Sequence, residues 1–211
     1  MKRAPFNKRR RPPSREAKRI FYVFCEGGNT EPKYFAALQR ATKNALVEIK
    51  TYKGAGVPKT LAGKAIALRK SLRGARRKNS FEGRDEVWAI FDRDDHEGYY
   101  EAIALCNDAK VGVANSNPCF EVWLVLHNQD YHKPDGREDV YKLLKKLCPE
   151  YDTDSKTLDF DNLMPKIREA EKLAQKQLAR RIEEGGNPLG PPYTLVFKLT
   201  TSIREASDSS T

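Results

Sequence analysis

The 211-residue chain has no apolar run long enough to cross a bilayer, and its first residues lack the apolar segment of a secretory signal. We therefore expect a soluble, cytoplasmic protein. Cysteine is scarce, and its four widely spaced positions match neither a zinc pattern nor a disulfide framework. Most of them lie among apolar neighbours, so we expect buried reduced thiols at Cys25, Cys106, Cys119 and Cys148.

Histidine is rarer still, with three residues, and none belongs to a Cys/His cluster with zinc-binding spacing. His127 follows an apolar helical segment and is expected to cap that helix's carbonyls. The phosphate-binding pattern Gly-x-x-x-x-Gly-Lys-Ser/Thr is also absent. Any use of ATP would therefore belong to a partner protein.

Acidic residues are nearly missing from the first 19 positions, which hold nine Lys or Arg and one acid, Glu16. Three prolines in this segment discourage helix, so we expect a disordered tail. Such a tail can simply improve solubility. We favour an arm that contacts phosphates, because dense positive charge gives sequence-independent affinity through counterion release. Its central cluster is Lys8, Arg9, Arg10 and Arg11.

Acids are entirely missing between Lys50 and Lys78, where ten Lys or Arg occur. Residues 60–75 carry apolar side chains at helical spacing, so a helix with one buried face is expected. A charge run usually marks a solvated face, but such faces mix both signs. We therefore favour a nucleic-acid groove formed by the basic residues off the apolar stripe. These are Lys64, Arg69, Lys70, Arg73, Arg76 and Arg77.

Two short apolar runs each end in carboxylates. The run Ile20–Cys25 precedes Glu26 and two glycines, and Val87–Phe91 precedes Asp92, Arg93, Asp94 and Asp95. Parallel strands would bring the acids to one edge of a sheet, where open α/β sheets place their chemistry. Clustered carboxylates repel one another unless a cation lies between them, and oxygen ligands suit Mg²⁺ or Mn²⁺. The alternation of an extended chain turns Asp95 away from the other two aspartates.

These residues also carry a family resemblance. Strand-Glu-Gly followed by strand-Asp-x-Asp resembles the Toprim pattern of topoisomerases, primases and a group of nucleases. Cys-Glu-Gly-Gly-Asn-Thr-Glu-Pro-Lys-Tyr-Phe, Phe-Asp-Arg-Asp-Asp and Ser-Asn-Pro-Cys-Phe-Glu-Val-Trp-Leu-Val-Leu-His together resemble the RloB family, from about Ile20 to Leu199. Its members are known as Toprim-like proteins, often encoded beside an ATPase and associated with restriction loci and phage defence. The resemblance implies metal binding by Asp92 and Asp94, with Glu26 as a ligand or an acid/base.

Two further side chains are candidates for catalysis. Glu121 lies at the start of an otherwise apolar helix, where the helix dipole alone would stabilise it. The alternative is that it points to the metal site as a ligand or base. His96 lies close enough to Asp94 to act as a general acid or base, although a surface histidine fits the sequence equally well.

Strands alternating with helices predict an α/β fold with a mostly parallel sheet. The resemblance makes this a Toprim-like, Rossmannoid domain with a helical C-terminal elaboration. We predict a basic tail over residues 1–19, one domain over 20–200 and a flexible tail over 201–211. Within the domain, Ser116 or Asn117 is expected to cap a helix over 120–127, and helices are expected over 163–184 and 193–199.

Three functions remain open from the sequence. The favoured one is a Mg²⁺-dependent nuclease acting on DNA or RNA, tRNA included, in phage defence with a partner ATPase. The second is a non-catalytic nucleic-acid-binding subunit whose acids hold a structural ion. The third is another Toprim phosphotransfer enzyme, such as a topoisomerase or primase component. The sequence shows neither a zinc ribbon nor a catalytic-tyrosine domain, which counts against this function.

Overall fold

The computed structural model describes residues 18–44, 46–76, 85–93, 98–185, 187 and 189–208, without the side chains of residues 74–76. Its centre is a four-stranded sheet in the order β2-β1-β3-β4, and every neighbouring pair is parallel. The predicted α/β class with a parallel sheet is therefore confirmed. The strands are β1 (Arg19–Cys25), β2 (Val47–Tyr52), β3 (Glu86–Ile90) and β4 (Gly112–Val113).

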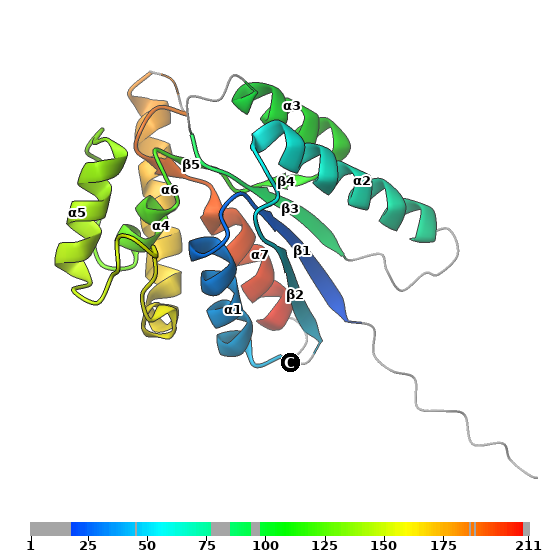
Figure 1. Ribbon diagram of the computed structural model, residues 1–211, viewed down its shortest axis with the longest axis horizontal. Coiled ribbons are helices and arrows are strands. Elements are labelled where there is room, and N and C mark those ends of the chain that lie inside the picture. Colours follow the sequence, from blue (N-terminus) through cyan, green and yellow to red (C-terminus); the bar gives the residue numbers. More distant parts are fainter. Residues whose placement is uncertain are drawn as a thin grey trace, which may run out of the picture.

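Helices cover both faces of the sheet (Figure 1). On one face lie α2 (Pro58–Arg76) and α3 (Tyr99–Ala109), and on the other lie α1 (Thr30–Thr42) and α7 (Val196–Asp208). A helical extension completes the second side with α4 (Glu121–Leu126), α5 (Arg137–Leu147) and α6 (Ile167–Glu183). In the part of the chain that the structure describes, no helix combines the length and apolar character of a membrane span.

Strand β1 is apolar from Ile20 to Cys25, and its side chains pack on both faces of the sheet. Phe21, Val23 and Cys25 contact the core beneath α1 and α7. Tyr22 and Phe24 point to the core beneath α2 and α3. This alternation is the period of two that an extended chain imposes. All four cysteines are buried free thiols, as predicted.

Strand β4 can approach β3 because position 112 is glycine. Gly112 pairs with Trp88 across the two strands. A Cβ at position 112 would lie 2.4 Å from the Trp88 ring, so no larger residue fits there without moving the indole. The tryptophan in turn donates to Glu86 Oε2 at 2.8 Å.

The expected helix cap at Ser116 or Asn117 is wrong. These residues form β5 (Ser116–Asn117), which pairs antiparallel with β6 (Tyr193–Thr194). The Ser116 and Thr194 hydroxyls lie 2.9 Å apart, adding a side-chain contact to the pairing. A partner 78 residues away satisfies this backbone, and local sequence signals cannot reveal such a partner. Helix α4 therefore begins later than expected, at Glu121.

The flexible tail expected over residues 201–211 is also wrong for positions 201–208. Helix α7 continues to Asp208, and Ile203 and Ala206 are buried. They extend the apolar stripe of Val196 and Leu199 at helical spacing, so burial stabilises the last turns. Conversely, the helix expected over 193–199 begins only at Val196, because the two preceding residues belong to β6.

The helix expected over 163–184 is divided in two. A 3₁₀ helix, η2 (Phe160–Lys166), contains Pro165 and precedes α6. Proline has no amide hydrogen to donate, so the regular α-helical pattern starts beyond it.

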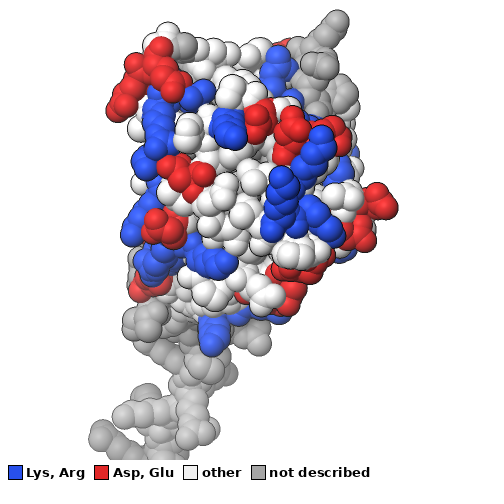
Figure 2. Space-filling view, turned by 90° about the vertical axis from the view of Figure 1, so that its left-hand side faces the viewer, with Lys and Arg blue, Asp and Glu red and all other residues white. Residues whose placement is uncertain are grey.

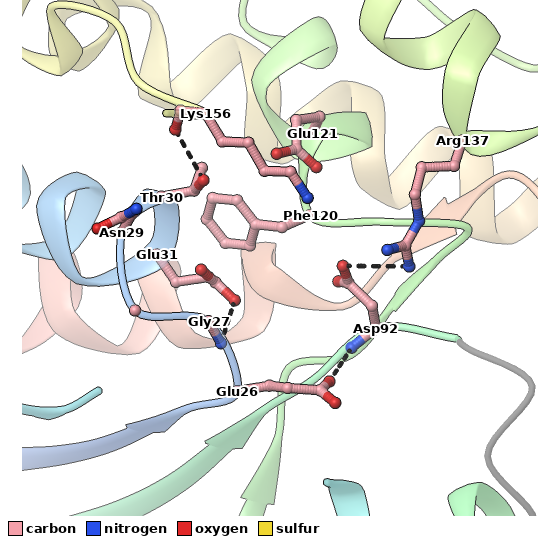
Figure 3. A pocket seen from close by; sticks show the side chains of 11 residues that line it. Glu26, Gly27, Asn29, Thr30, Glu31, Asp92, Phe120, Glu121, Arg137 and Lys156 are labelled. Carbon is pink, nitrogen blue, oxygen red and sulfur yellow. Dashed lines mark hydrogen bonds and ion pairs between the residues drawn. The ribbon is translucent and has the colours of Figure 1, made fainter. Parts of the chain in front are cut away.

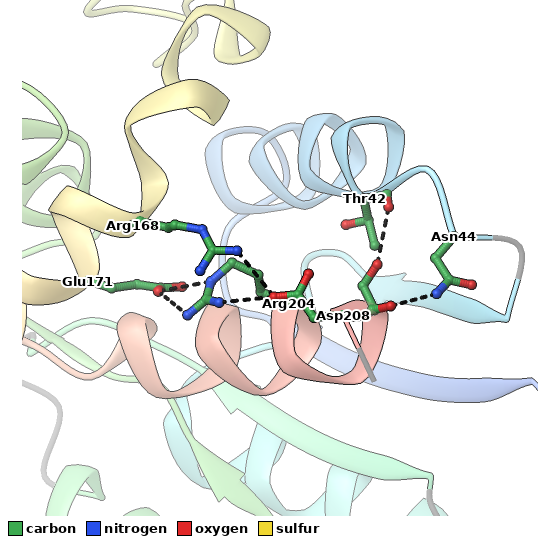
Figure 4. A network of polar contacts seen from close by, with 7 residues as sticks. Thr42, Asn44, Arg168, Glu171, Arg204 and Asp208 are labelled. Carbon is green, nitrogen blue, oxygen red and sulfur yellow. Dashed lines mark hydrogen bonds and ion pairs between the residues drawn. The ribbon is translucent and has the colours of Figure 1, made fainter. Parts of the chain in front are cut away.

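A polar network joins α6 to α7 (Figure 4). Glu171 is 3% exposed and accepts from Arg204 at 2.9 and 3.2 Å. Asp208 accepts from both Arg204 and Arg168. The main-chain carbonyl of Ser207 accepts from Asn44, which ties the end of α7 to the turn before β2. These polar contacts help to hold the C-terminal helix against the domain.

Candidate functional site

A pocket of about 250 Å³ lies beyond the C-terminal ends of β1 and β3 (Figure 3). Four acidic residues line it: Glu26 after β1, Asp92 after β3, Glu31 in α1 and Glu121 in α4. Two basic side chains, Arg137 and Lys156, line the same space. The pocket therefore has an excess of negative charge, at the edge of the sheet where the sequence places the chemistry.

Glu26 and Asp92 are neighbours because their strands are in register. Cys25 pairs with Ile90, and the Glu26 amide donates to the Ile90 carbonyl at 3.0 Å. One residue beyond Phe91, the Asp92 amide donates to Glu26 Oε2 at 3.1 Å. The sheet thus holds both acids by backbone contacts.

The two oxygens of Asp92 have different surroundings. Oδ2 lies 3.7 Å from Arg137 Nη2, whereas Oδ1 is buried and accepts no hydrogen bond. Burial raises the pKa of Asp92 well above its usual value, and the charges of Glu31, Glu121 and Glu26 raise it further, against Arg137. A buried carboxylate oxygen without a donor is unfavourable, and a cation would relieve it.

Glu31 folds back towards the turn that follows β1. Its Oε1 accepts from the Gly27 amide at 3.1 Å, and the residue is 6% exposed. A Cβ on Gly27 would lie 2.3 Å from Glu31 Oε2, so glycine is what lets this carboxylate sit against the turn. Burial raises the pKa of Glu31, opposed by its own amide and that of Gly27.

Glu121 is the first residue of α4 and only 3% exposed. Its Oε1 accepts from the Tyr151 hydroxyl at 3.3 Å, and its side chain lines the pocket (Figure 3). Its side chain thus points into the pocket that Glu26 and Asp92 also line. The helix dipole acts on the same side chain and favours its negative charge.

The two basic residues come from the C-terminal half of the chain. Arg137 begins α5 and also donates to the Pro118 carbonyl at 3.2 Å. Lys156 lies in a turn whose ends, Asp152 and Thr157, pair with each other. The Lys156 carbonyl accepts from Thr30 Oγ1 at 2.8 Å, which fastens this turn to the start of α1.

The donor atoms present suit a hard divalent cation. Asp92 Oδ1 is buried and unpaired, and the adjacent Glu26 also supplies a carboxylate. Across the described positions, no three His, Cys, Asp or Glu residues form a complete metal-binding group. Asp94, the third predicted ligand, lies outside those positions, as does His96. Among the described residues, Glu26 and Asp92 thus supply two neighbouring carboxylates but no complete ligand set.

The predicted basic helix lies elsewhere, since α2 packs on the opposite face of the sheet from α1 (Figure 1). Lys64 donates to the Ala55 carbonyl at 2.8 Å, and Arg69 donates to the Asp85 carbonyl at 3.1 Å. Lys70 and Arg73 are exposed. The side chain of Arg76 is not described, and Arg77 and the tail residues Lys8, Arg9, Arg10 and Arg11 lie outside the described residues.

His127 has a structural role. Its Nδ1 lies 2.9 Å from the Trp123 carbonyl, and its Nε2 lies 3.2 Å from the Tyr34 hydroxyl. The expected contact with a helix carbonyl is therefore confirmed. Burial lowers the pKa of this imidazole from 6.5 to about 4, so the neutral ring is the form that the core accommodates.

Sequence reasoning missed Glu31, Arg137 and Lys156 as pocket residues. Glu31 carried a signal, because it stands five positions after Glu26 and three before the apolar pair Tyr34-Phe35. An acid on the inner face of a helix is rarely buried without a role. Arg137 and Lys156 had no such signal, since only the packing of α5 and the 152–157 turn brings them to the sheet.

The parallel sheet and the acidic pocket at its carboxyl edge define an α/β protein whose site lies beyond the strand ends. The family model for RloB-like proteins matches residues 21–203. The chain therefore belongs to the RloB-like family. Neither the curated proteins nor the solved structures include a significant match.

Proposed function

We propose that this protein is a Mg²⁺- or Mn²⁺-dependent nuclease that hydrolyses phosphodiester bonds in DNA or RNA. The observation that carries the proposal is the pocket in which Glu26, Asp92 and Glu121 come together from three separate elements. The Toprim-like pattern of Glu26, Asp92 and Asp94 supports the same reaction class. The carboxylates that follow β1 and β3 belong to both the pocket and the pattern.

Glu26, Asp92 and Asp94 would hold the ion. The buried Asp92 Oδ1 supports this assignment, because it accepts no hydrogen bond and a cation would satisfy it. Bound there, the ion would neutralise the charge that builds on the phosphate during hydrolysis. Without the ion, the negative charge of the pocket's carboxylates would repel a phosphodiester.

The remaining pocket residues have complementary roles in this proposal. Glu121, oriented by the Tyr151 hydroxyl, would accept a proton from the attacking water. Arg137 and Lys156 would bind phosphate oxygens in the pocket. His96 remains the candidate proton donor to the leaving oxygen.

We further propose that the protein acts in phage defence with an ATPase partner. The resemblance to RloB proteins supports this role, since they are often encoded beside an ATPase at restriction loci. The chain itself has no P-loop pattern. ATP-driven steps would therefore take place on the partner.

Cleavage assays test the proposal directly. Labelled tRNA, single-stranded DNA and duplex DNA are incubated with the protein in Mg²⁺, Mn²⁺ or EDTA, with and without the product of any neighbouring ATPase gene. We expect metal-dependent cleavage that Glu26→Gln and Asp92→Asn abolish. Binding without cleavage in every condition, or cleavage that persists in both variants, would contradict the nuclease assignment.

A further inference from the structure

A second hollow opens directly beside the carboxylate pocket. It has a volume of about 680 Å³ and lies between α5 and the turn at residues 152–157. Five basic side chains and two acidic ones line it, together with Tyr141 and Thr153. The basic residues are Arg137, Lys142, Lys145, Lys146 and Lys156, and the acidic ones are Glu138 and Asp154.

The two hollows share residues. Arg137 and Lys156 line both of them, so the basic surface reaches the edge of the acidic pocket. Lys156 Nζ lies 5.2 Å from the centre of the Tyr141 ring, a cation–π contact within the second hollow. Figure 3 shows the Arg137 side chain extending towards Asp92 and the Lys156 side chain extending into the pocket. We call the second hollow the α5 groove.

The positive charge of the groove is built into the fold. Lys145 donates to the Tyr151 carbonyl at 2.6 Å, so it joins α5 to the segment before the turn. Lys142 and Lys146 are exposed and four residues apart, and therefore lie on one side of α5. Lys142 also pairs with Asp139 at 3.2 Å, an exposed contact of the kind that a phosphate can replace at little cost. Figure 2 shows the side of the molecule that carries α5, where Lys and Arg side chains lie among Asp and Glu side chains.

We propose that the α5 groove binds the phosphate backbone of a nucleic-acid strand and leads that strand to the carboxylate pocket. The inference rests on the proposed nuclease function, because it assigns the substrate path to the same site. Charge complementarity carries it: five basic and two acidic side chains line the groove, which is therefore net positive, whereas the pocket it joins is acidic and would repel phosphate approaching alone.

This assignment differs from the one that the sequence favours. The acid-free run belongs to α2, on the opposite face of the sheet from α1 (Figure 1). Two of its basic side chains, Lys64 and Arg69, already contact main-chain carbonyls. Lys145 and Arg137 also contact main-chain carbonyls, but the α5 residues line a hollow that meets the pocket, whereas no described residue of α2 lines either one. They can therefore hold a strand whose scissile phosphate is in the pocket.

Paired charge reversals distinguish the two surfaces. Lys142→Glu with Lys146→Glu changes the α5 groove, and Lys70→Glu with Arg73→Glu makes the same change in net charge on α2. All four positions are exposed helical sites. Binding of a fluorescent single-stranded oligonucleotide is measured at several salt concentrations with Mg²⁺ present, in a Glu26→Gln background that prevents cleavage. Melting temperatures verify that each variant folds, and Lys142→Gln with Lys146→Gln replaces the reversal if it does not.

We expect the α5 variant to lose at least about tenfold in affinity, and the slope of log affinity against log salt to fall by about 1.4 in magnitude, the value for two lost phosphate contacts on a single strand. The α2 variant should bind like its parent. Normal binding by the α5 variant, or equal losses in both variants, overturns the inference. Binding through α5 without cleavage by the unmutated protein would support the groove and contradict the nuclease assignment.

Discussion

The main-chain amide of Asp92 donates a hydrogen bond of 3.1 Å to Oε2 of Glu26, across 66 residues of sequence. The contact exists because the strands that precede these residues pair in parallel, with Cys25 opposite Ile90. Two acids that repel each other in solution are therefore held at adjacent positions of one rigid edge. Mutations at the two residues should therefore have effects that are related but can be distinguished.

The first prediction concerns Asp92→Asn. Because the folded protein raises the pKa of Asp92, the ionised side chain costs stability at neutral pH when no metal is bound. We expect the metal-free variant to melt at a higher temperature than the metal-free parent. Mg²⁺ should raise the melting temperature of the parent and leave that of the variant unchanged, since binding stabilises only a state with an intact site. Calorimetry with Mg²⁺ and with EDTA measures both effects.

Glu150→Gln is the control for this experiment, because Glu150 is exposed and lies outside the pocket. It should respond to Mg²⁺ as the parent does. Equal Mg²⁺ stabilisation of Asp92→Asn and the parent would show that Asp92 does not hold the ion.

The second prediction compares two adjacent glycines. A methyl group at position 27 would meet Glu31 Oε2 at 2.3 Å, whereas one at position 28 would meet nothing within 4 Å. Gly27→Ala should therefore displace the buried Glu31 carboxylate and lower cleavage by about tenfold to a hundredfold, the range seen when a metal site loses its supporting contacts. Gly28→Ala should retain activity. Cleavage rates and melting temperatures of the two variants provide the comparison. Equal activity would show that the position of the Glu31 carboxylate does not affect cleavage.

The third prediction concerns the pH dependence of folding stability through His127. Its pKa falls from 6.5 to about 4 in the folded protein, so the unfolded chain takes up the proton first as pH decreases. The stabilisation associated with neutral His127 is complete above pH 6.5 and is lost as pH falls towards 4. Between pH 7 and pH 5 this amounts to about 2 kcal/mol.

Urea unfolding of the parent and of His127→Gln at both pH values measures this term. The variant should lose about 2 kcal/mol less than the parent on acidification, whatever its stability at pH 7. His132→Gln changes an exposed histidine and should behave like the parent. A parent-like pH profile for His127→Gln would mean that the imidazole titrates freely in the folded state.

The fourth prediction concerns the buried ion pair between α6 and α7. Arg204→Met leaves Glu171 buried without its cation and should lower the free energy of unfolding by about 3 kcal/mol. Combining it with Glu171→Met should restore much of the loss, because no buried charge then remains. Breaking the exposed Glu169–Lys172 pair should change stability by less than about 0.5 kcal/mol. Chemical unfolding decides, and a small effect of Arg204→Met would show that Glu171 is solvated or neutral.

Local patterns in the sequence determine the sheet and the acids at its edge. The apolar run before Glu26 and the one before Asp92 each have the length and composition of a buried strand, and a carboxylate follows at once. Parallel strands align their carboxyl ends, so the proximity of Glu26 and Asp92 follows from pattern and topology together. The apolar helix that starts with Glu121 can also be predicted from the sequence, but the direction of the Glu121 side chain cannot.

Tertiary structure alone determines the rest of the site. Arg137 and Lys156 come to the pocket because α5 packs on α4 and because the 152–157 turn hydrogen bonds to Thr30. The pairing of Ser116 and Asn117 with Thr194 and Tyr193, and the burial of Ile203 and Ala206 in α7, likewise depend on partners distant in the chain. Propensity and periodicity report on neighbours within a few residues, whereas burial and strand pairing depend on the whole fold. The strands and their acids are therefore readable from the sequence, but the cations that face those acids are not.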